Sequence, residues 1–547
     1  MARKEIAMNN LKQLNSNFVE LLGLDLDEVK KKIELSLSLE DKSLSTVIGN
    51  SKSSVSDNHQ TIDSPHSITL AYDANKPRIK HTEIFNLLLN NIDKVDFREE
   101  AGADVDKDKL KYNDYLVTCS EKVLEVAEEC GLGIYDIANH AYLYNGEYWK
   151  RTNNNKIYSF LIDAANKMGV SKNTAKHITF IEQLKGQLLF LAKTHFAEND
   201  NNDKILINLL NGTFEIDGYD TRLRKPEKED LLTYQLPFKY DENAECPIFD
   251  EYLNTVLPDK DNQKVLMEYL GYLFVKNDTL KLEKALILYG TGANGKSVLF
   301  EILNALLGGS NNVSHYSLQN LTNENGYYRA MLGNKLVNYA SEINGKMDVS
   351  IFKQLVSGEP VDARLPYGDP FTIYNYGKMI FNCNQLPTSV EQTNAFFRRF
   401  LIIPFEVTIP EEQQDKQLAK KIIKSELSGV LNRVLEGLKR ILDQKSFTNS
   451  EAVDASINNY KKESDNVALF IEEKGYESSE EFVLASTLFE EYKSFCFQSG
   501  YNSIGKHSFN QRLKNSGFNI KRINVGIIAY VKKNKFENNS SHSSQTS

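Results

Sequence analysis

The chain has 547 residues, of which 41% are hydrophobic and 25% are charged, and its formal net charge is −9 at pH 7. These proportions are typical of a globular protein and exclude a fibrous or wholly disordered chain. At about 150 residues per domain, the length predicts three to four domains. No apolar run is long enough to span a bilayer, and no apolar segment follows the charged start, so we expect an intracellular protein without a membrane anchor or secretory signal.

The cysteines and histidines give no sign of a metal or disulfide framework. The five cysteines include no Cys-x-x-Cys pair, and the nine histidines do not group with cysteines or carboxylates at ligand spacing. The acidic net charge gives no overall sign of nucleic-acid binding either, so the local distribution of basic residues has to decide that question.

The N-terminal segment, residues 1–75, is predicted to consist of a helix and a linker. Apolar residues such as Leu11, Leu14 and Phe18 recur at helical spacing within the first 40 residues. A stretch rich in Ser, Asn and Asp, with few large apolar residues, then extends over residues 41–66 and has the composition of a flexible connection.

Residues 76–245 are predicted to form a mainly helical α+β domain. Helical patterns dominate from residue 79 to residue 196. Two Asn-Gly pairs, Asn145-Gly146 and Asn211-Gly212, lie between apolar runs, and this arrangement predicts two β-hairpins.

Residues 246–447 alternate short apolar runs with helical segments, which is typical of an α/β domain built around a parallel sheet. The predicted helices cover residues 265–275, 296–307 and 411–443, and the predicted strands cover residues 285–289, 336–340, 379–383 and 400–403.

The motif Gly290-Thr291-Gly292-Ala293-Asn294-Gly295-Lys296-Ser297 follows a predicted strand and opens a predicted helix. It matches G-x-x-x-x-G-K-[ST], the pattern of a phosphate-binding loop. Glycines allow backbone N–H groups to surround phosphate oxygens, and the helix N-terminus adds partial positive charge. We expect Lys296 to neutralise the β- and γ-phosphates of ATP and Ser297 to ligate Mg²⁺.

Polar residues adjoin three further predicted strands. Glu342 follows the strand 336–340, where a carboxylate would hold Mg²⁺ and polarise the attacking water, and Asn384 follows the strand 379–383, where an amide would orient that water. Arg398 and Arg399 precede the strand 400–403, where an arginine finger would stabilise the γ-phosphoryl group, commonly from a neighbouring subunit. For Glu342, the structural alternative is a strand that ends in Glu by chance. For Arg398 and Arg399, it is a salt-bridged helix end.

The C-terminal part, residues 448–536, is predicted to contain helices followed by a strand, and a Ser- and Asn-rich tail over 537–547 is expected to be disordered. A helix at 509–516 followed by a strand at 525–531 suits a winged helix that binds DNA, with Lys514, Lys521 and Arg522 as candidate contacts. A solvated charged face is the alternative. Between positions 505 and 536 there is no acid, and the basic residues are Lys506, Arg512, Lys514, Lys521, Arg522, Lys532, Lys533 and Lys535.

The order of these parts resembles a superfamily 3 helicase, in particular the phage, plasmid and poxvirus-type primase–helicases. The resemblance covers roughly residues 80–535. It departs from the family at Ser357-Gly358-Glu359, where Gly-Gly-Asp is common, and no primase catalytic domain is recognisable before the motor. The segments that carry it are Ala340-Ser341-Glu342, residues 353–364, Asn384-Gln385-Leu386-Pro387 and Arg398-Arg399-Phe400, with further likeness at Asn211-Gly212, residues 240–247 and residues 460–465.

The resemblance implies a P-loop AAA+-like ATPase core with a parallel sheet, flanked by the helical N-terminal domain and a C-terminal winged helix. It also implies a homo-oligomeric ring, expected to be a hexamer, that binds ATP and Mg²⁺ between subunits. Arg399 is preferred over Arg398 as the finger, because the family's finger directly precedes the strand. The hairpin at residues 363–371 would project into the channel, where Lys353, Arg364 and Tyr367 are candidate contacts to single-stranded DNA.

A phosphate-binding loop of this kind is compatible with three functions. The favoured one is an ATP-dependent replicative DNA helicase of a phage, plasmid or other mobile element, which acts in the cytoplasm of a bacterial or host cell with single-stranded and origin DNA and a separate primase or polymerase as partners. The alternative is a replication initiator whose ATP site only switches assembly. A small-molecule kinase is disfavoured, because it predicts neither the arginine pair nor a basic C-terminal module.

Overall fold

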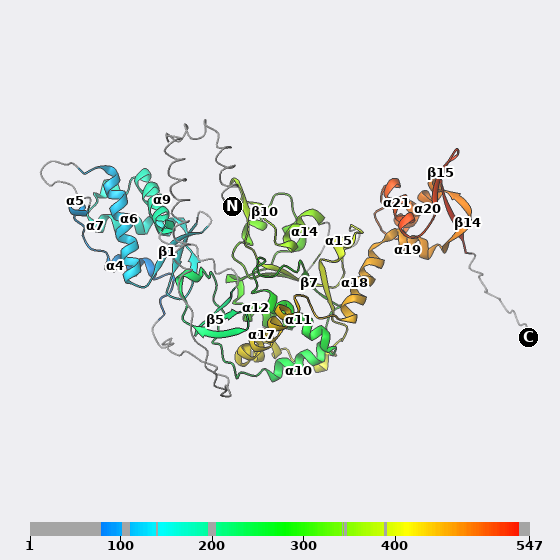
Figure 1. The fold of residues 1–547 in the computed structure, drawn as a ribbon, viewed down its shortest axis with the longest axis horizontal. Helices are drawn as coiled ribbons and strands as arrows, with labels where there is room; N and C mark the ends of the chain where they lie inside the picture. Colours follow the sequence, from blue (N-terminus) through cyan, green and yellow to red (C-terminus); the bar gives the residue numbers. More distant parts are fainter. Residues whose placement is uncertain are drawn as a thin grey trace, which may run out of the picture. The chain divides into compact units, whose positions relative to one another are not determined.

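The computed structural model describes residues 78–100, 110–137, 140–194, 204–341, 343, 347–387 and 391–534. The helix and linker predicted for residues 1–75, and the tail predicted for 537–547, lie outside these residues. In the described part, no helix is both long and apolar enough to cross a membrane. The fold of this part is mixed α/β, with one parallel sheet and several small antiparallel ones (Figure 1).

Residues 78–194 form helices packed on a small antiparallel sheet with the order β1–β2–β3. The buried faces of α4, α6, α7 and α9 share one hydrophobic core. The first predicted hairpin is confirmed, because β2 and β3 are joined across Asn145-Gly146. The elements are α4 (Ile84–Asn91), α5 (Phe97–Glu100), α6 (Tyr112–Glu129), β1 (Gly133–Ile137), β2 (His140–Tyr144), β3 (Trp149–Arg151), α7 (Asn154–Met168), α8 (Lys172–Ala175) and α9 (Ile178–Thr194).

A second antiparallel sheet, with the order β4–β5–β6, precedes the central sheet in the chain. Leu209 pairs with Gly212, which confirms the second predicted hairpin. Buried Asn208 ties this sheet to the preceding one, since its amide donates to the Glu147 carbonyl at 2.8 Å. The elements are β4 (Ile205–Leu209), β5 (Gly212–Asp217), β6 (Asp220–Arg224) and a short 3₁₀ helix at Lys228–Asp230.

The central sheet has five strands in the order β13–β7–β12–β9–β8, and all neighbouring pairs are parallel. The carboxyl ends of the strands therefore meet at one edge, which is where ligands bind in open α/β sheets. The four predicted strands are confirmed as β7, β9, β12 and β13. The strands are β7 (Ala285–Tyr289), β8 (Val313–Ser314), β9 (Val337–Ala340), β12 (Lys378–Cys383) and β13 (Phe400–Pro404).

Helices cover both faces of this sheet (Figure 1). Leu286 and Leu288 of β7 belong to a core with α10, α11, α12, α16 and α17, whereas Ala285 and Ile287 belong to a core with α13, α14, α15 and Tyr460 of α18. The helices are α10 (Pro247–Val256), α11 (Lys260–Tyr272), α12 (Lys296–Leu306), α13 (Leu318–Leu321), α14 (Val349–Ser357), α15 (Asn394–Phe397), α16 (Leu418–Ser425), α17 (Leu427–Gln444) and α18 (Glu451–Ser464), with 3₁₀ turns at Gly309–Asn311, Arg329–Met331 and Glu411–Gln413.

The single helix predicted over residues 411–443 is wrong, because the chain breaks at Glu426 between α16 and α17. The Glu426 carboxylate accepts hydrogen bonds from the backbone N–H groups of Ile248 at 3.0 Å and Phe249 at 2.9 Å, in the first turn of α10. Helical periodicity alone does not reveal this contact, because the two partners lie far apart in the sequence.

Helices α11 and α17 cross with their backbones in contact. A Cβ atom at Gly271 would lie 2.7 Å from the Leu438 Cα, and one at Gly437 would collide with the Met267 backbone. Glycine therefore permits an approach that a larger residue would prevent. Next to the crossing, the buried carboxylate of Glu268 accepts from the Thr448 N–H at 2.8 Å.

The C-terminal module follows α18 and has its own hydrophobic core, which includes Phe470, Tyr492 and Phe509. Its sheet has the antiparallel order β14–β16–β15. The predicted helix 509–516 and strand 525–531 correspond to α21 and β16. The elements are α19 (Asn466–Glu473), β14 (Tyr476–Leu484), α20 (Ala485–Gln498), α21 (Lys506–Asn515), β15 (Ile520–Ile523) and β16 (Gly526–Lys533).

Candidate nucleotide site and DNA contacts

The glycine-rich motif forms the loop between β7 and α12, at the carboxyl edge of the central sheet. The backbone turns through positive φ at Gly292 (118°), Ala293 (47°) and Gly295 (84°). A Cβ atom at Gly290 would collide with the Asn294 amide and the Phe405 carbonyl oxygen. Such a closed turn, with its N–H groups leading into a helix N-terminus, provides a cradle for phosphate oxygens.

Lys296 is buried at the first position of α12. Its ammonium donates to the Gly290 carbonyl oxygen at 2.7 Å and to the Asn294 Oδ1 at 2.9 Å. Burial lowers the pKa of Lys296. Among the described residues, no carboxylate pairs with this ammonium, and a buried cation of this kind is favourably placed to bind an anionic ligand.

The predicted Mg²⁺ ligands are described only in part. Ser297 follows Lys296 and is exposed at the start of α12, so its hydroxyl is accessible next to the phosphate cradle. Glu342 lies outside the described residues. The strand that leads to it, β9, ends at Ala340 beside Phe381 of β12, at the same edge of the sheet as the loop.

Asn384 follows β12 and is brought to the phosphate loop by the pairing of β12 with β7. Cys383 pairs with Tyr289, and the carbonyl oxygen of Cys383 accepts from the Gly290 N–H at 3.0 Å. Asn384 is exposed at this position. The turn after it is held by the Cys383 thiol, which donates to the Gln385 carbonyl at 2.6 Å.

Arg398 and Arg399 differ sharply in their environment. Arg399 is 8% exposed, and its guanidinium donates to the Ser357 hydroxyl at 3.1 Å and to the Ala395 carbonyl. The Arg398 side chain is 60% exposed and contacts the Glu283 carboxylate at 2.8 Å. Arg399 is thus hydrogen-bonded within its own chain, whereas Arg398 lies at the surface.

The predicted DNA-binding hairpin is formed by β10 (Val361–Arg364) and β11 (Pro370–Ile373). Tyr367 is fully exposed in the turn between the strands and has a φ of 61°. The Arg364 Nε donates to the Gly368 carbonyl at 2.8 Å, within the same hairpin. Lys353 lies on α14, where it pairs with Glu391 at 2.7 Å.

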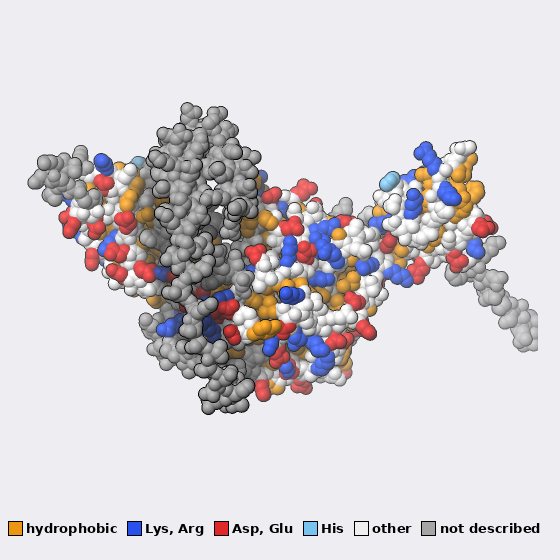
Figure 2. Space-filling model, viewed as in Figure 1, with side chains coloured by type: hydrophobic (Ala, Val, Ile, Leu, Met, Phe, Trp, Pro, Cys, Tyr) orange, Lys and Arg blue, Asp and Glu red, His pale blue; other side chains and the backbone are white. Residues whose placement is uncertain are grey.

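Lys514, Lys521 and Arg522 are all exposed on the C-terminal module, the first on α21 and the others on β15. Figure 2 shows Lys and Arg side chains on the surface of this module, next to a patch of hydrophobic side chains. The β15–β16 turn contributes the exposed side chains Ile523, Val525 and Ile527 to the module surface.

A cavity of about 290 Å³ adjoins the start of the phosphate loop, and residues outside the sequence motifs line part of it. Ser456, Asn459, Tyr460 and Glu463 of α18 line it together with residues of the loop and of the β13 end. A sequence signal existed only for Tyr460 and Glu463, within the segment 460–465. The residues from the earlier elements are Tyr289, Gly290, Thr291, Leu386, Pro404, Phe405 and Glu406.

Three family models match successive parts of the chain. Residues 121–258 match the model described as D5 N terminal like, residues 288–399 match a family of unknown function (DUF5906), and residues 462–545 match the model described as Poxvirus D5 protein-like. Two of the three models thus concern D5 proteins, and they match on both sides of the phosphate loop.

A curated relative is the protein named "Putative helicase L207/L206" of Acanthamoeba polyphaga mimivirus, which is 26% identical over 227 residues. The match covers 39% of this chain and 23% of the relative, so the chain spans less than a quarter of the relative's length. Among solved structures, the apo A form of the NrS-1 C-terminal region has a TM-score of 0.40 at 13% identity and covers 75% of this chain and 99% of that chain. Another apo structure of that region has a TM-score of 0.39 at 14% identity, with 75% and 98% coverage.

Proposed function

We propose that this chain, a D5-like member of the primase–helicase family, is an ATP-dependent DNA helicase that acts as a ring in the replication of a phage, plasmid or other mobile element. The observation that carries the proposal is the meeting of the Gly290–Lys296 loop with Asn384 at one edge of the parallel sheet. This edge would be the ATP site of a P-loop, AAA+-like core.

In the proposed site, the backbone N–H groups of the loop bind the phosphates, and Lys296 exchanges its hydrogen bonds to Gly290 and Asn294 for bonds to phosphate oxygens. Asn384 orients the attacking water, and Glu342 remains the proposed acid that polarises it. Mg²⁺, held by Ser297 and Glu342, would neutralise phosphate charge.

DNA would be contacted at two places. The turn of the β10–β11 hairpin presents Tyr367, an aromatic side chain free to stack on a base, with Arg364 in the same hairpin. The C-terminal module has the element order α19–β14–α20–α21–β15–β16, which supports a winged helix, and exposes Lys514, Lys521 and Arg522. Lys353 is a weaker candidate, because Glu391 already neutralises it.

A ring would complete each ATP site with an arginine from the neighbouring subunit. The exposure of the Arg398 side chain, 60% against 10% for Arg399, favours Arg398 for this role. Arg399 would then hold the end of α15 in place through Ser357 and Ala395. A hexamer remains the expected state.

The second candidate function is an initiator that binds origin DNA and uses ATP only to switch assembly. The observation that favours it is the concentration of exposed basic residues in the C-terminal module, which suits duplex binding. A separate primase or polymerase would be recruited under either function.

The test is the ATPase rate of the wild type and of Lys296→Ala, each with and without single-stranded DNA. We expect DNA-stimulated turnover in the wild type and a loss on the order of 10²-fold or more in the variant, because a charge that stabilises the transition state is removed. Circular dichroism would establish that the variant is folded. Wild-type turnover in a folded variant would refute the assigned site, and tight origin binding with negligible wild-type hydrolysis would favour the initiator.

A further inference from the structure

The C-terminal end of α18 contacts the segment that carries Asn384 and the arginine pair. The Tyr460 hydroxyl donates to the Pro387 carbonyl at 2.9 Å, three residues after Asn384. The Ser464 hydroxyl accepts from the Gln392 amide at 3.0 Å and donates to the Tyr460 carbonyl at 2.6 Å. Two successive turns of α18 thus contact the chain at Pro387 and at Gln392.

Tyr460 also packs against the two phenylalanines that flank the arginine pair. It is 2% exposed, and its ring packs edge-on against Phe397 at 5.4 Å and Phe400 at 5.7 Å between ring centroids. These two phenylalanines flank Arg398 and Arg399 directly. Burial raises the pKa of Tyr460, so its hydroxyl stays protonated and can donate throughout the physiological range.

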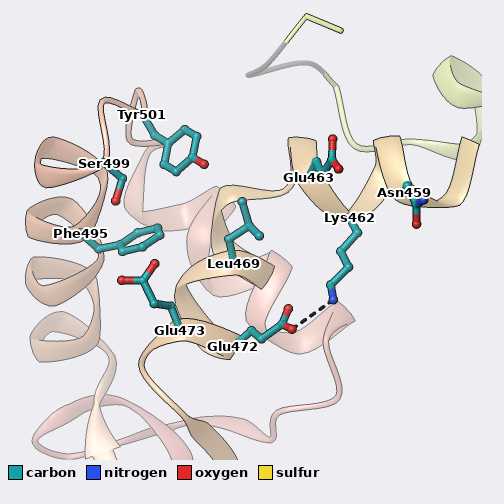
Figure 3. Close-up of a pocket in the computed structure, with 9 residues that line it drawn as sticks. All are labelled: Asn459, Lys462, Glu463, Leu469, Glu472, Glu473, Phe495, Ser499 and Tyr501. Carbon is teal, nitrogen blue, oxygen red and sulfur yellow. Dashed lines mark hydrogen bonds and ion pairs between the residues drawn. The ribbon is translucent and has the colours of Figure 1, made fainter. Parts of the chain in front are cut away.

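The same helix end is fixed on its other side by the C-terminal module. Asp465 caps α19 by accepting from the Val467 N–H at 3.0 Å, and it also accepts from Arg512 of α21 at 3.2 Å. Lys462 pairs with Glu472 at 3.1 Å on the wall of a cavity of about 510 Å³ (Figure 3).

Two residues of α18, Asn459 and Glu463, each line two cavities. One is the 510 Å³ cavity next to the C-terminal module, and the other is the 290 Å³ cavity beside the phosphate loop. The end of α18 is therefore held between the C-terminal module and the edge of the sheet where the nucleotide would bind.

We infer that Tyr460 and Ser464 are positioning residues for ATP hydrolysis: they fix two described stretches, residues 384–387 with Asn384 and residues 391–399 with the arginine pair, relative to the phosphate loop. This inference rests on the proposed function. The physical basis is that an amide orienting water and an arginine stabilising a phosphoryl group act only at defined positions, so that small displacements cost rate rather than substrate affinity. The phosphate loop is held differently, because its Gly290 N–H donates to the Cys383 carbonyl and its Asn294 amide donates to the Phe405 carbonyl. Among the described residues, the hydrogen bond and ring contacts of Tyr460 go to Pro387, Phe397 and Phe400 and not to the loop.

The decisive comparison is between Tyr460→Phe and Tyr269→Phe. Both changes remove one buried hydroxyl that donates to a backbone carbonyl, of Pro387 after β12 in one case and of Met379 within β12 in the other. The Tyr269 hydroxyl lies 2.7 Å from the Met379 carbonyl and 3.1 Å from the Lys284 carbonyl, at the amino ends of β12 and β7 and away from the phosphate loop. We expect Tyr460→Phe to lower kcat about fivefold, the equivalent of one hydrogen bond, with the KM for ATP changed less than about twofold. Tyr269→Phe should change neither constant.

Ser464→Ala provides an independent variant with the same expected fall in kcat and an unchanged KM. Equal kcat values for Tyr460→Phe, Tyr269→Phe and the wild type would overturn the inference, as would a parallel rise in KM. Failure of the proposed function is distinguishable, because in that case the wild type would show no hydrolysis that depends on Lys296.

Discussion

At the scale of single residues, the structure places two adjacent arginines in different environments, with Arg399 buried and Arg398 largely exposed. The preference for Arg399 relied on its place next to the strand 400–403, which is also the place where a side chain enters the core. Arg399 is buried, and its Nε has no hydrogen-bond partner among the described residues. Arg398 has a side chain that is 60% exposed, and it pairs with the half-buried carboxylate of Glu283, a kind of pair that contributes little to stability when one partner is largely in solvent.

The two arginines should therefore respond differently to substitution. We expect Arg399→Met to lower the free energy of unfolding by about 1–3 kcal/mol, because it removes buried hydrogen bonds to Ser357 and Ala395. Arg398→Ala should change stability by less than about 0.5 kcal/mol and yet lower turnover on the order of 10³-fold if it is the finger. Urea unfolding and ATPase rates measure the two effects. Full turnover in Arg398→Ala would return the role to Arg399.

At the scale of elements, short apolar runs bounded by glycine or polar residues were sufficient to predict β7, β9, β12 and β13, because strands buried on both faces need uniformly apolar sequences. The strand β1 was not predicted, since Gly133 and Asp136 interrupt its apolar character. The break at Glu426 was not predicted either, because its cause is a contact with α10 rather than a local signal. The sequence thus identified the elements that build the phosphate loop but not the contacts of α18.

The C-terminal module provides a prediction at this scale. Replacing Lys514, Lys521 and Arg522 together by Gln should flatten the dependence of log K on log salt for duplex DNA by about 2.7, since each phosphate contact contributes roughly 0.9. Lys493→Gln is the control, because Lys493 lies on α20 of the same module and pairs with Glu490. Fluorescence anisotropy at several salt concentrations gives the slopes. An unchanged slope in the triple variant would indicate a solvated face that does not bind DNA.

At the scale of the whole molecule, the order of the sheet places the phosphate loop between β13 and β12, so that Asn384 and the end of β13 flank it. The motifs predicted a parallel sheet with Asn384 after one strand and the arginine pair before another, but not the strand order, which depends on pairing between distant segments. The surface through which subunits of a ring would contact one another could not be predicted from the sequence. The pattern of apolar and polar residues does not distinguish an exposed arginine that contacts a neighbouring subunit from one that contacts water.

A mixing experiment tests the ring directly. In the proposed ring, a Lys296→Ala subunit would lack its own phosphate contact, and an Arg398→Ala subunit would be unable to complete its neighbour's site. If the finger acts between subunits, the mixture should regain hydrolysis well above either variant alone, because some interfaces combine both intact residues. Gel filtration of differently tagged forms establishes that subunits exchange. Confirmed exchange without recovery would mean that Arg398 acts within its own subunit or has no catalytic role.

The glycine crossing of α11 and α17 has a consequence for how the protein folds. The helix α11 precedes the central sheet in the chain and α17 follows it, so their contact at Gly271 and Gly437 closes a very long loop. Contacts of this kind form late, because the entropy of closing the loop is lost before the contact stabilises the chain. During synthesis, the contact between α11 and α17 therefore cannot form until α17 has left the ribosome. The apolar faces that later enclose the core around β7 stay exposed for that interval, which is when aggregation competes most strongly with folding.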